Sequence, residues 1–226
     1  MRRVKIQYVS DLHLERKVSF PRIPVRAPYL ILPGDIGCPY KRNYRDFLRY
    51  CSDNYKWTGL VLGNHEYLSK DYRKTIDMAR HAIRDMPNVK LLHRNTHLLE
   101  EQVLVAGCTL WTPYSITPMT IDGKRILASH LHDKDSDWLK SLIERVEYPL
   151  VVATHHLPSE RLIGKKYKKY NNQKEYASNL DHLFNSKSLK AWLCGHSHDS
   201  IELYHNDVYL GLNAGDNANM ERVFSL

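Results

Sequence analysis

The sequence predicts an α/β fold in which two sheets pack together and helices lie on the outside. Short apolar runs alternate with helical periodicity in the first half of the chain, and the second half is rich in strand-like runs. Of the 226 residues, 42% are hydrophobic, which is enough for one substantial core. No repeat, low-complexity segment or linker divides the sequence. We therefore expect a single domain spanning residues 1–226.

Periodicity locates the elements of the first half. Residues 4–9 alternate apolar and polar side chains, as a half-buried strand does. Helical periodicity at 70–86 stops before Pro87, because the residue before a proline is disfavoured in the helical conformation. The predicted strands are 4–9, 29–32, 59–62 and 89–92, and the predicted helices are 40–53 and 70–86.

The second half contains most of the predicted strands. The runs 97–100 and 103–110 are close enough to form a hairpin. An amphipathic helix is predicted at 137–146, and the region after Tyr176 is expected to be helical. The remaining predicted strands are 150–153, 191–194, 201–205 and 208–212.

Composition restricts the setting and the partners. The formal charge of +8 favours an anionic partner. No apolar stretch approaches the ~20 residues of a membrane span, and the first residues lack the apolar core of a signal peptide. The four cysteines are scattered without a CxxC pair, which favours reduced thiols and a cytoplasmic location. They are Cys38, Cys51, Cys108 and Cys194.

Polar residues with metal-binding side chains follow five of the predicted strands. In α/β sheets the carboxyl ends of the strands form the crevice where ligands bind. The segments are Asp11-Leu12-His13, Gly34-Asp35, Gly63-Asn64-His65-Glu66, Thr154-His155-His156 and Gly195-His196-Ser197-His198. Each motif alone is weak, but together and in this order they predict a metal site at one edge of the sheets.

The ordered motifs DLH, GD, GNHE, HH and GHSH resemble those of the calcineurin-like metallophosphoesterase superfamily over nearly the whole chain. The stretches VAGCTLWTPY, VVATHHLPS and AWLCGHSHDS are similar to small single-domain phosphoesterases of bacteria, phages and large DNA viruses. The resemblance implies a β-sandwich of two sheets between helices, a four-layer αββα architecture. This agrees with the strand pattern.

The resemblance also implies a set of site residues. One metal is expected on Asp11, His13 and His198, and the other on Asn64, His155 and His196, with Asp35 bridging the two. His65 is expected to act as general acid or to stabilise the transition state. Glu66 is expected to orient its neighbours, whereas His156 either touches substrate or has a structural role.

These residues imply a chemistry. A phosphodiester repels hydroxide, so a catalyst must supply positive charge and a nucleophile together. The expected reaction is attack on a phosphoester by a hydroxide that bridges two divalent metal ions, and a phosphodiester is favoured. Imidazole-rich coordination without cysteine suits Mn, Fe, Zn or Co, and we expect manganese.

The basic segment RLIGKKYKKYNNQKEY follows the HH motif and contains five lysines and three tyrosines. It is interpreted either as solvated surface or as a lid for a nucleotide or single-stranded nucleic acid. The lid lysines would be Lys165, Lys166, Lys168 and Lys169.

Departures from the superfamily narrow the substrate. The stretches GDIGCPY and VLGNHEY lack the GDxVDRG motif and the arginine before GNHE that are usual in protein Ser/Thr phosphatases, which disfavours phosphoproteins. The alternative is a non-catalytic scaffold that kept the fold. Retention of His65 and of all seven ligand positions favours the enzyme, and the sequence does not define the oligomeric state.

Overall fold

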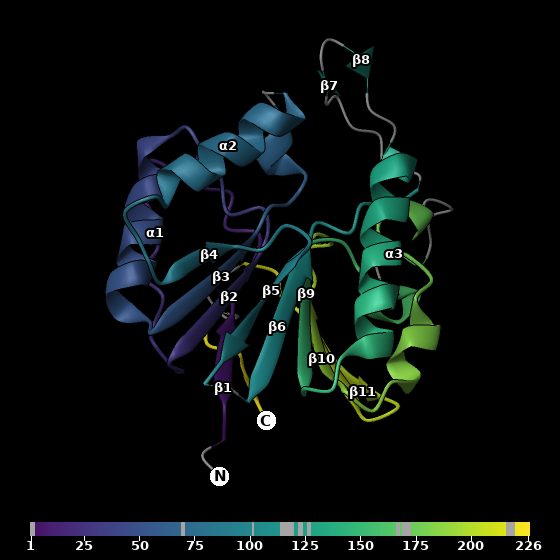
Figure 1. Ribbon diagram of the computed structural model, residues 1–226. Coiled ribbons are helices and arrows are strands. Elements are labelled where there is room, and N and C mark those ends of the chain that lie inside the picture. Colours follow the sequence, from purple (N-terminus) through teal and green to yellow (C-terminus); the bar gives the residue numbers. More distant parts are fainter. Residues whose placement is uncertain are drawn as a thin grey trace.

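The computed structural model of the chain describes residues 3–68, 71–100, 102–113, 120–121, 124–125, 128–165, 168, 173–215 and 220–226. Two mixed sheets lie face to face between helices (Figure 1). Helices α1 (Arg42–Asn54) and α2 (Tyr72–Ala82) cover the outer face of one sheet. Helix α3 (Ala128–Arg145) covers the other. The predicted fold of two sheets flanked by helices is confirmed.

The first sheet has the strand order β13-β1-β2-β3-β4. Strands β1 to β4 are parallel, and β13 pairs antiparallel with β1 at the edge. Their bounds are β1 (Lys5–Tyr8), β2 (Tyr29–Pro33), β3 (Trp57–Val61), β4 (Val89–Leu91) and β13 (Val223–Ser225). Strand β13 was not expected from the sequence.

The second sheet has the order β11-β12-β10-β9-β6-β5. Its four central strands are parallel, and β11 and β5 are antiparallel edges. The bounds are β5 (Asn95–Leu99), β6 (Val103–Cys108), β9 (Leu150–Thr154), β10 (Leu189–Cys194), β11 (Ile201–His205) and β12 (Val208–Leu212). Two short strands, β7 (Thr120–Ile121) and β8 (Lys124–Arg125), pair separately.

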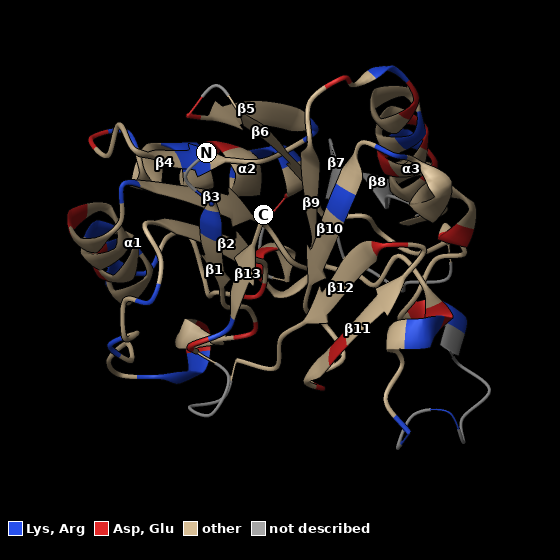
Figure 2. Cartoon of the chain, turned by 90° about the horizontal axis from the view of Figure 1, so that it is seen from below, with Lys and Arg blue, Asp and Glu red and all other residues tan. Residues whose placement is uncertain are grey.

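Alternation along the strands explains the layers. In β9, Val151 and Ala153 join the core between the sheets, whereas Leu150 and Val152 join the core under α3. Successive side chains of a strand point to opposite faces, so a strand that is apolar throughout can contribute to two cores at once. Most charged residues consequently lie on helices and loops, and the strands carry few of them (Figure 2).

One helix of the second half starts earlier than predicted, and another predicted helix is absent from the described residues. Helix α3 begins at Ala128 rather than at 137, and the region after Tyr176 forms only a short 3-10 turn at Asp181–Asn185. There the N–H groups of Ser178 and Leu180 donate to carbonyls of Leu157 and Pro158. Backbone groups that hydrogen-bond to a neighbouring segment cannot form a helix at the same time.

None of the helices in the described part of the chain combines the length and the apolar character that a membrane crossing requires.

Candidate metal centre

The loops that follow β1, β2, β3, β9 and β10 meet where the two sheets adjoin. His155, after β9, donates from Nδ1 to the carbonyl of Pro33 at the end of β2, over 2.9 Å. The backbone N–H of His196, after β10, lies 3.1 Å from both carboxylate oxygens of Asp11. These contacts bring together side chains that are up to 185 residues apart in the chain.

Asp11, His13 and His198 form one group of potential ligands, whose donor atoms all lie within 4.8 Å of one another. Nε2 of His198 is 3.5 Å from a carboxylate oxygen of Asp11 and 3.0 Å from Nε2 of His13. Asp11 and His13 are buried, whereas the side chain of His198 is half exposed. A carboxylate and two imidazoles at this separation fit a divalent transition metal.

Asp11, Asp35 and His155 form a second, fully buried group within the same limit. Nε2 of His155 lies 3.4 Å from Asp35 and 2.8 Å from the side-chain oxygen of Asn64. Because Nδ1 of His155 is held by a carbonyl, its Nε2 faces the oxygens and is positioned to bind a cation. Asp35 also lies 3.9 Å from Nε2 of His13, so it stands between the two groups.

Five of the seven predicted ligands have a positive φ angle. The values are 55° for Asp11, 47° for His13, 52° for Asp35, 78° for His196 and 52° for His198. Residues with a side chain rarely adopt this left-handed conformation, which costs on the order of 1–3 kcal/mol each and is concentrated at functional sites. The local backbone is therefore held in costly conformations at the positions where the side chains converge.

Glu66 holds the loops under the second group. Its buried carboxylate accepts hydrogen bonds from the backbone N–H groups of Asp35, Ile36, Gly37 and Gly63, at 2.8–3.2 Å. A side chain at Gly63 would place its Cβ only 2.2 Å from an oxygen of Asp35, so this turn has room for glycine alone. Glu66 therefore ties the loop after β2 to the loop after β3.

His65 points toward the same centre. Its Nδ1 lies 3.3 Å from Glu15, its Nε2 lies 4.0 Å from Asp35, and its backbone N–H donates to Asp35 over 2.9 Å. The hydrogen bond to Glu15 raises the pKa of His65, which favours the protonated form that a general acid requires.

Glu15 was not recognised in the sequence. One of its oxygens accepts hydrogen bonds from Nδ1 of both His13 and His65. Partial burial opposes ionisation, but these hydrogen bonds outweigh it and lower the pKa of Glu15 to about 2. The only available signal was its place two residues after His13.

Asn213 and Ser10 were also missed. The side-chain oxygen of Asn213 accepts from the N–H groups of Ser10 and Gly215, at 3.1 and 3.0 Å. The hydroxyl of Ser10 in turn donates to the carboxylate of Asp11. Asn213 follows β12, so it ties the end of that strand to the loop that carries Asp11.

Burial and charge divide the histidines of the centre. Burial lowers the pKa of His196 to about 3 and the pKa of His156 well below its usual value, so both imidazoles are neutral. Burial opposes protonation of His155 as well, but the adjacent Asp35 raises its pKa to about 9. The same pairing holds the pKa of Asp35 below its usual range despite burial, whereas burial raises the pKa of Asp11 to about 6. Asp35 is therefore ionised in the middle of the centre, where its negative charge attracts a cation.

His156 is buried behind the predicted ligands. Its ring centre lies 4.1 Å from that of His196 and 5.5 Å from that of Trp111, and its Nδ1 lies 3.4 Å from the carbonyl of Thr109. These contacts support a structural role. The ring centre of Tyr176 lies 5.4 Å from that of His196.

The basic segment 161–176 begins and ends near the centre. Gly164 lies so close to Asp199, next to His198, that a Cβ there would be 1.8 Å from its carboxylate. Lys165 and Lys168 are exposed, and Lys166 and Lys169 lie outside the described residues. The placement of its two ends beside the GHSH loop agrees with either interpretation of the segment.

Comparison with known proteins connects this geometry to a family. The family model described as calcineurin-like phosphoesterase matches residues 5–200. An uncharacterized protein of Acanthamoeba polyphaga mimivirus is 28% identical over 252 residues, covering 92% of this chain and 89% of the viral protein.

Solved structures resemble the fold. A phosphopantetheinyl hydrolase from Mycobacterium tuberculosis superposes with a TM-score of 0.69 at 14% identity, covering 92% of this chain and 88% of that one. A dimetal phosphatase from Danio rerio gives a TM-score of 0.58 at 10% identity, covering 92% and 86%. At these identities the likeness concerns the fold.

Proposed function

Because the chain belongs to the calcineurin-like phosphoesterase family, we propose that it is a dinuclear metal-dependent hydrolase that prefers phosphodiesters. One observation carries the proposal. Asp35 stands between two groups of potential ligands, 3.4 Å from Nε2 of His155 and 3.9 Å from Nε2 of His13. A buried carboxylate in this position is suited to be shared by two cations.

The proposed division of the ligands follows the family resemblance, and the first group of potential ligands, Asp11, His13 and His198, supports it. Asp11, His13 and His198 would hold one ion, and Asn64, His155 and His196 the other, with Asp35 shared. When bound, two divalent cations polarise the phosphoryl oxygens and lower the pKa of water. The imidazole-rich donor set supports Mn, Fe, Zn or Co, with manganese as our proposal.

His65 would protonate the leaving group. With Nδ1 held by Glu15, its Nε2 faces the centre and can donate to the oxygen of the departing alcohol. The side chain is 21% exposed, so a substrate can reach it while water is partly excluded. Glu66 would fix the loop that carries Asp35 through hydrogen bonds to its backbone. Asn213 would fix the loop that carries Asp11 in the same way.

Two facts support a phosphodiester, with nucleotides and nucleic acids among the candidates. The stretch GDIGCPY has Cys38 where the phosphoprotein phosphatase motif has its second aspartate, and the chain carries a net charge of +8. A similar fold also belongs to a protein named phosphopantetheinyl hydrolase, and another to one named dimetal phosphatase.

All four cysteines are buried free thiols, which supports a cytoplasmic setting.

The alternative of a non-catalytic scaffold is less well supported. A scaffold has no need to keep five predicted ligands at positive φ, since relaxed conformations would stabilise its fold.

The test is a metal-titrated activity screen. Chelated protein would be reloaded with Mn²⁺, Fe²⁺, Zn²⁺ or Co²⁺ and assayed on phosphomonoesters, cyclic and linear phosphodiesters and short oligonucleotides. We expect metal-dependent turnover that is highest on a diester. Metal binding without turnover of any phosphoester would favour the scaffold.

A further inference from the structure

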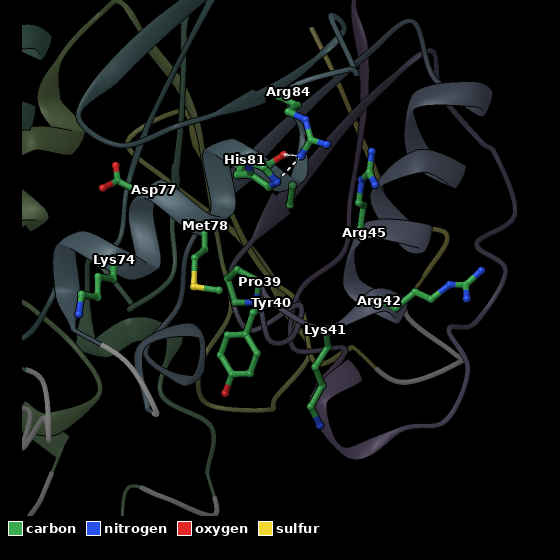
Figure 3. A pocket seen from close by; sticks show the side chains of 11 residues that line it. Pro39, Tyr40, Lys41, Arg42, Arg45, Lys74, Asp77, Met78, His81 and Arg84 are labelled. Atoms are coloured by element: carbon green, nitrogen blue, oxygen red, sulfur yellow. Dashed lines mark hydrogen bonds between the residues drawn. The ribbon is translucent and has the colours of Figure 1, made fainter.

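A cavity of about 750 Å³ lies between α1 and α2, outside the metal centre (Figure 3). Five basic side chains line it, against a single acidic one, Asp77. The basic residues are Lys41, Arg42, Arg45, Lys74 and Arg84. Its volume is in the range of pockets that hold small organic ligands.

The positive charge of this basic pocket is not cancelled by its neighbours. Arg42 pairs with Asp46, and Arg45 pairs with Asp85, at 3.5 and 2.8 Å. Asp85 also contacts Arg49, however, and Asp77 contacts Arg80. The added acids, Asp46 and Asp85, are therefore balanced by two added arginines, Arg49 and Arg80. Basic side chains still outnumber acidic ones in and around the pocket.

The first turn of α1 adds to this potential. The helix begins at Arg42, its N-cap residue Lys41 makes no side-chain cap hydrogen bond, and the first turn contains no acidic residue. The partial positive charge of the helix N-terminus therefore faces no carboxylate from its own first turn. This feature strengthens the cationic lining on the α1 side.

The pocket adjoins the loop that carries Glu15. Nζ of Lys41 donates to the backbone carbonyl of Glu15 over 2.8 Å, and the carboxylate of Glu15 holds His65. The opposite wall, α2, begins five residues after the 3-10 turn His65–Tyr67 ends. One wall of the pocket thus contacts the backbone of Glu15, and the other follows the His65 turn in the chain, so both walls are connected to loops of the metal centre.

The lining combines charge with flat apolar surface. The ring of Tyr40 is 42% exposed, and Figure 3 shows it beside Met78, between Lys74 on one wall and Lys41, Arg42 and Arg45 on the other. Cations spread over two walls suit several phosphates rather than one. An aromatic ring among cations is the arrangement that binds the bases and backbone of single strands.

We propose that the basic pocket binds the continuing strand of a single-stranded oligonucleotide whose scissile phosphodiester lies at the metal centre. This inference rests on the proposed function and specifies its substrate class. The pocket is separate from the basic segment 161–176, which follows a different strand.

The test removes pocket charge without touching the catalytic groups. The variant is Arg42→Gln, Lys74→Gln and Arg84→Gln, three exposed residues. The matched control is Lys134→Gln, Lys140→Gln and Lys187→Gln, which removes the same charge from exposed positions on α3 and before β10. Metal-loaded proteins would bind a fluorescent phosphorothioate strand of about 12 thymidylates, which resists cleavage, in an anisotropy titration across a salt series.

We expect the pocket variant to bind this strand about 10- to 100-fold more weakly, with a salt slope smaller by about 2, because each lost phosphate contact removes about 0.7. The control should stay within about twofold of wild type, as should the kcat/KM of the pocket variant on a small chromogenic diester. Affinity should rise with strand length up to several nucleotides.

If the pocket variant and the control bind the strand equally well, the basic pocket is not its binding site. A mononucleotide or a phosphopeptide that competes as well as the strand would overturn the assignment of an oligonucleotide. If the small diester is still cleaved in either case, the proposed hydrolase function is supported although the pocket proposal is wrong. Charge-dependent strand binding without cleavage of any phosphoester would support the pocket and contradict the proposed function.

Discussion

One carboxylate oxygen of Glu15 lies 3.3 Å from Nδ1 of His65. The same oxygen lies 2.9 Å from Nδ1 of His13, so one acid orients a predicted metal ligand and the proposed general acid together. The acid comes from the loop after β1, and His65 comes from the loop after β3. This link joins the two proposed tasks of binding metal and transferring a proton.

Glu15→Gln should therefore lower kcat by about 10- to 100-fold at saturating metal, as loss of an orienting carboxylate commonly does. Glutamine has nearly the same size but no charge, so it holds both imidazoles less firmly. The measurement is steady-state kinetics on diesters with leaving groups of different acidity. Glu147→Gln, at an exposed position, is the control, and equal kcat in both variants would contradict an orienting role.

His65→Ala should leave the metals in place and lower kcat by ~10²–10⁴-fold on a diester with a poor leaving group. The loss should be smaller when the departing alcohol is already acidic, because it then needs no proton. Metal content measured alongside kcat separates chemistry from binding. An unchanged kcat on the poor leaving group would remove His65 from this role.

Asp35→Asn should abolish activity and weaken both metals, since an amide is a poorer bridge between two cations than a carboxylate. The change is nearly isosteric but removes the charge next to His155, so the metal-free protein should be less stable, and its folding is checked by circular dichroism before metal analysis. Elemental analysis after gel filtration measures the effect. Two tightly bound metals in this variant would show that Asp35 is not shared.

His93 should make the fold sensitive to acid. It lies away from the metal centre, and burial, with Arg94 and Arg80 nearby, lowers its pKa to about 4. Nη2 of Arg94 donates to its Nε2 over 3.1 Å, which requires a neutral imidazole. In the unfolded chain the pKa is about 6.5, so the unfolded state binds the proton first and stability is lost as the pH falls below that value.

The corresponding variant is His93→Gln, which keeps a hydrogen-bond acceptor and does not titrate. Between pH 7.5 and 5 the wild type should lose about 2 kcal/mol more of its free energy of unfolding than this variant does. Urea titrations at a series of pH values provide the measurement, with His182→Gln at an exposed position as the control. Parallel pH curves for wild type and His93→Gln would refute the assignment.

Prediction from the sequence succeeded where the signal is local. Alternation and glycine punctuation located the β5–β6 hairpin and the parallel strands to within a few residues. It predicted a helix at 137–146 but missed the first turns of α3, which are polar. That part is held by long-range contacts, since Asp135 accepts from the N–H of Leu110 over 2.8 Å and pairs with Arg94 over 2.5 Å.

Strand β13 illustrates the same limit. Three residues carry too little pattern to predict a strand, and the segment is extended because its backbone pairs with β1, more than 200 positions away in the chain. The segment after Tyr176 is the converse case. Its sequence predicts a helix, but its backbone forms hydrogen bonds with the loop after β9 instead.

By itself, the sequence determined the two-sheet α/β class, the family resemblance and the chemical types of the candidate ligands, because periodicity and motif order are properties of neighbouring residues. Only the tertiary structure decided that Glu15 serves both His13 and His65, that Glu66 ties the loops of Asp35 and Gly63 together, and that cations from α1 and α2 face a common pocket. Such contacts depend on how the strands and helices pack, and spacing along the chain carries no record of that packing.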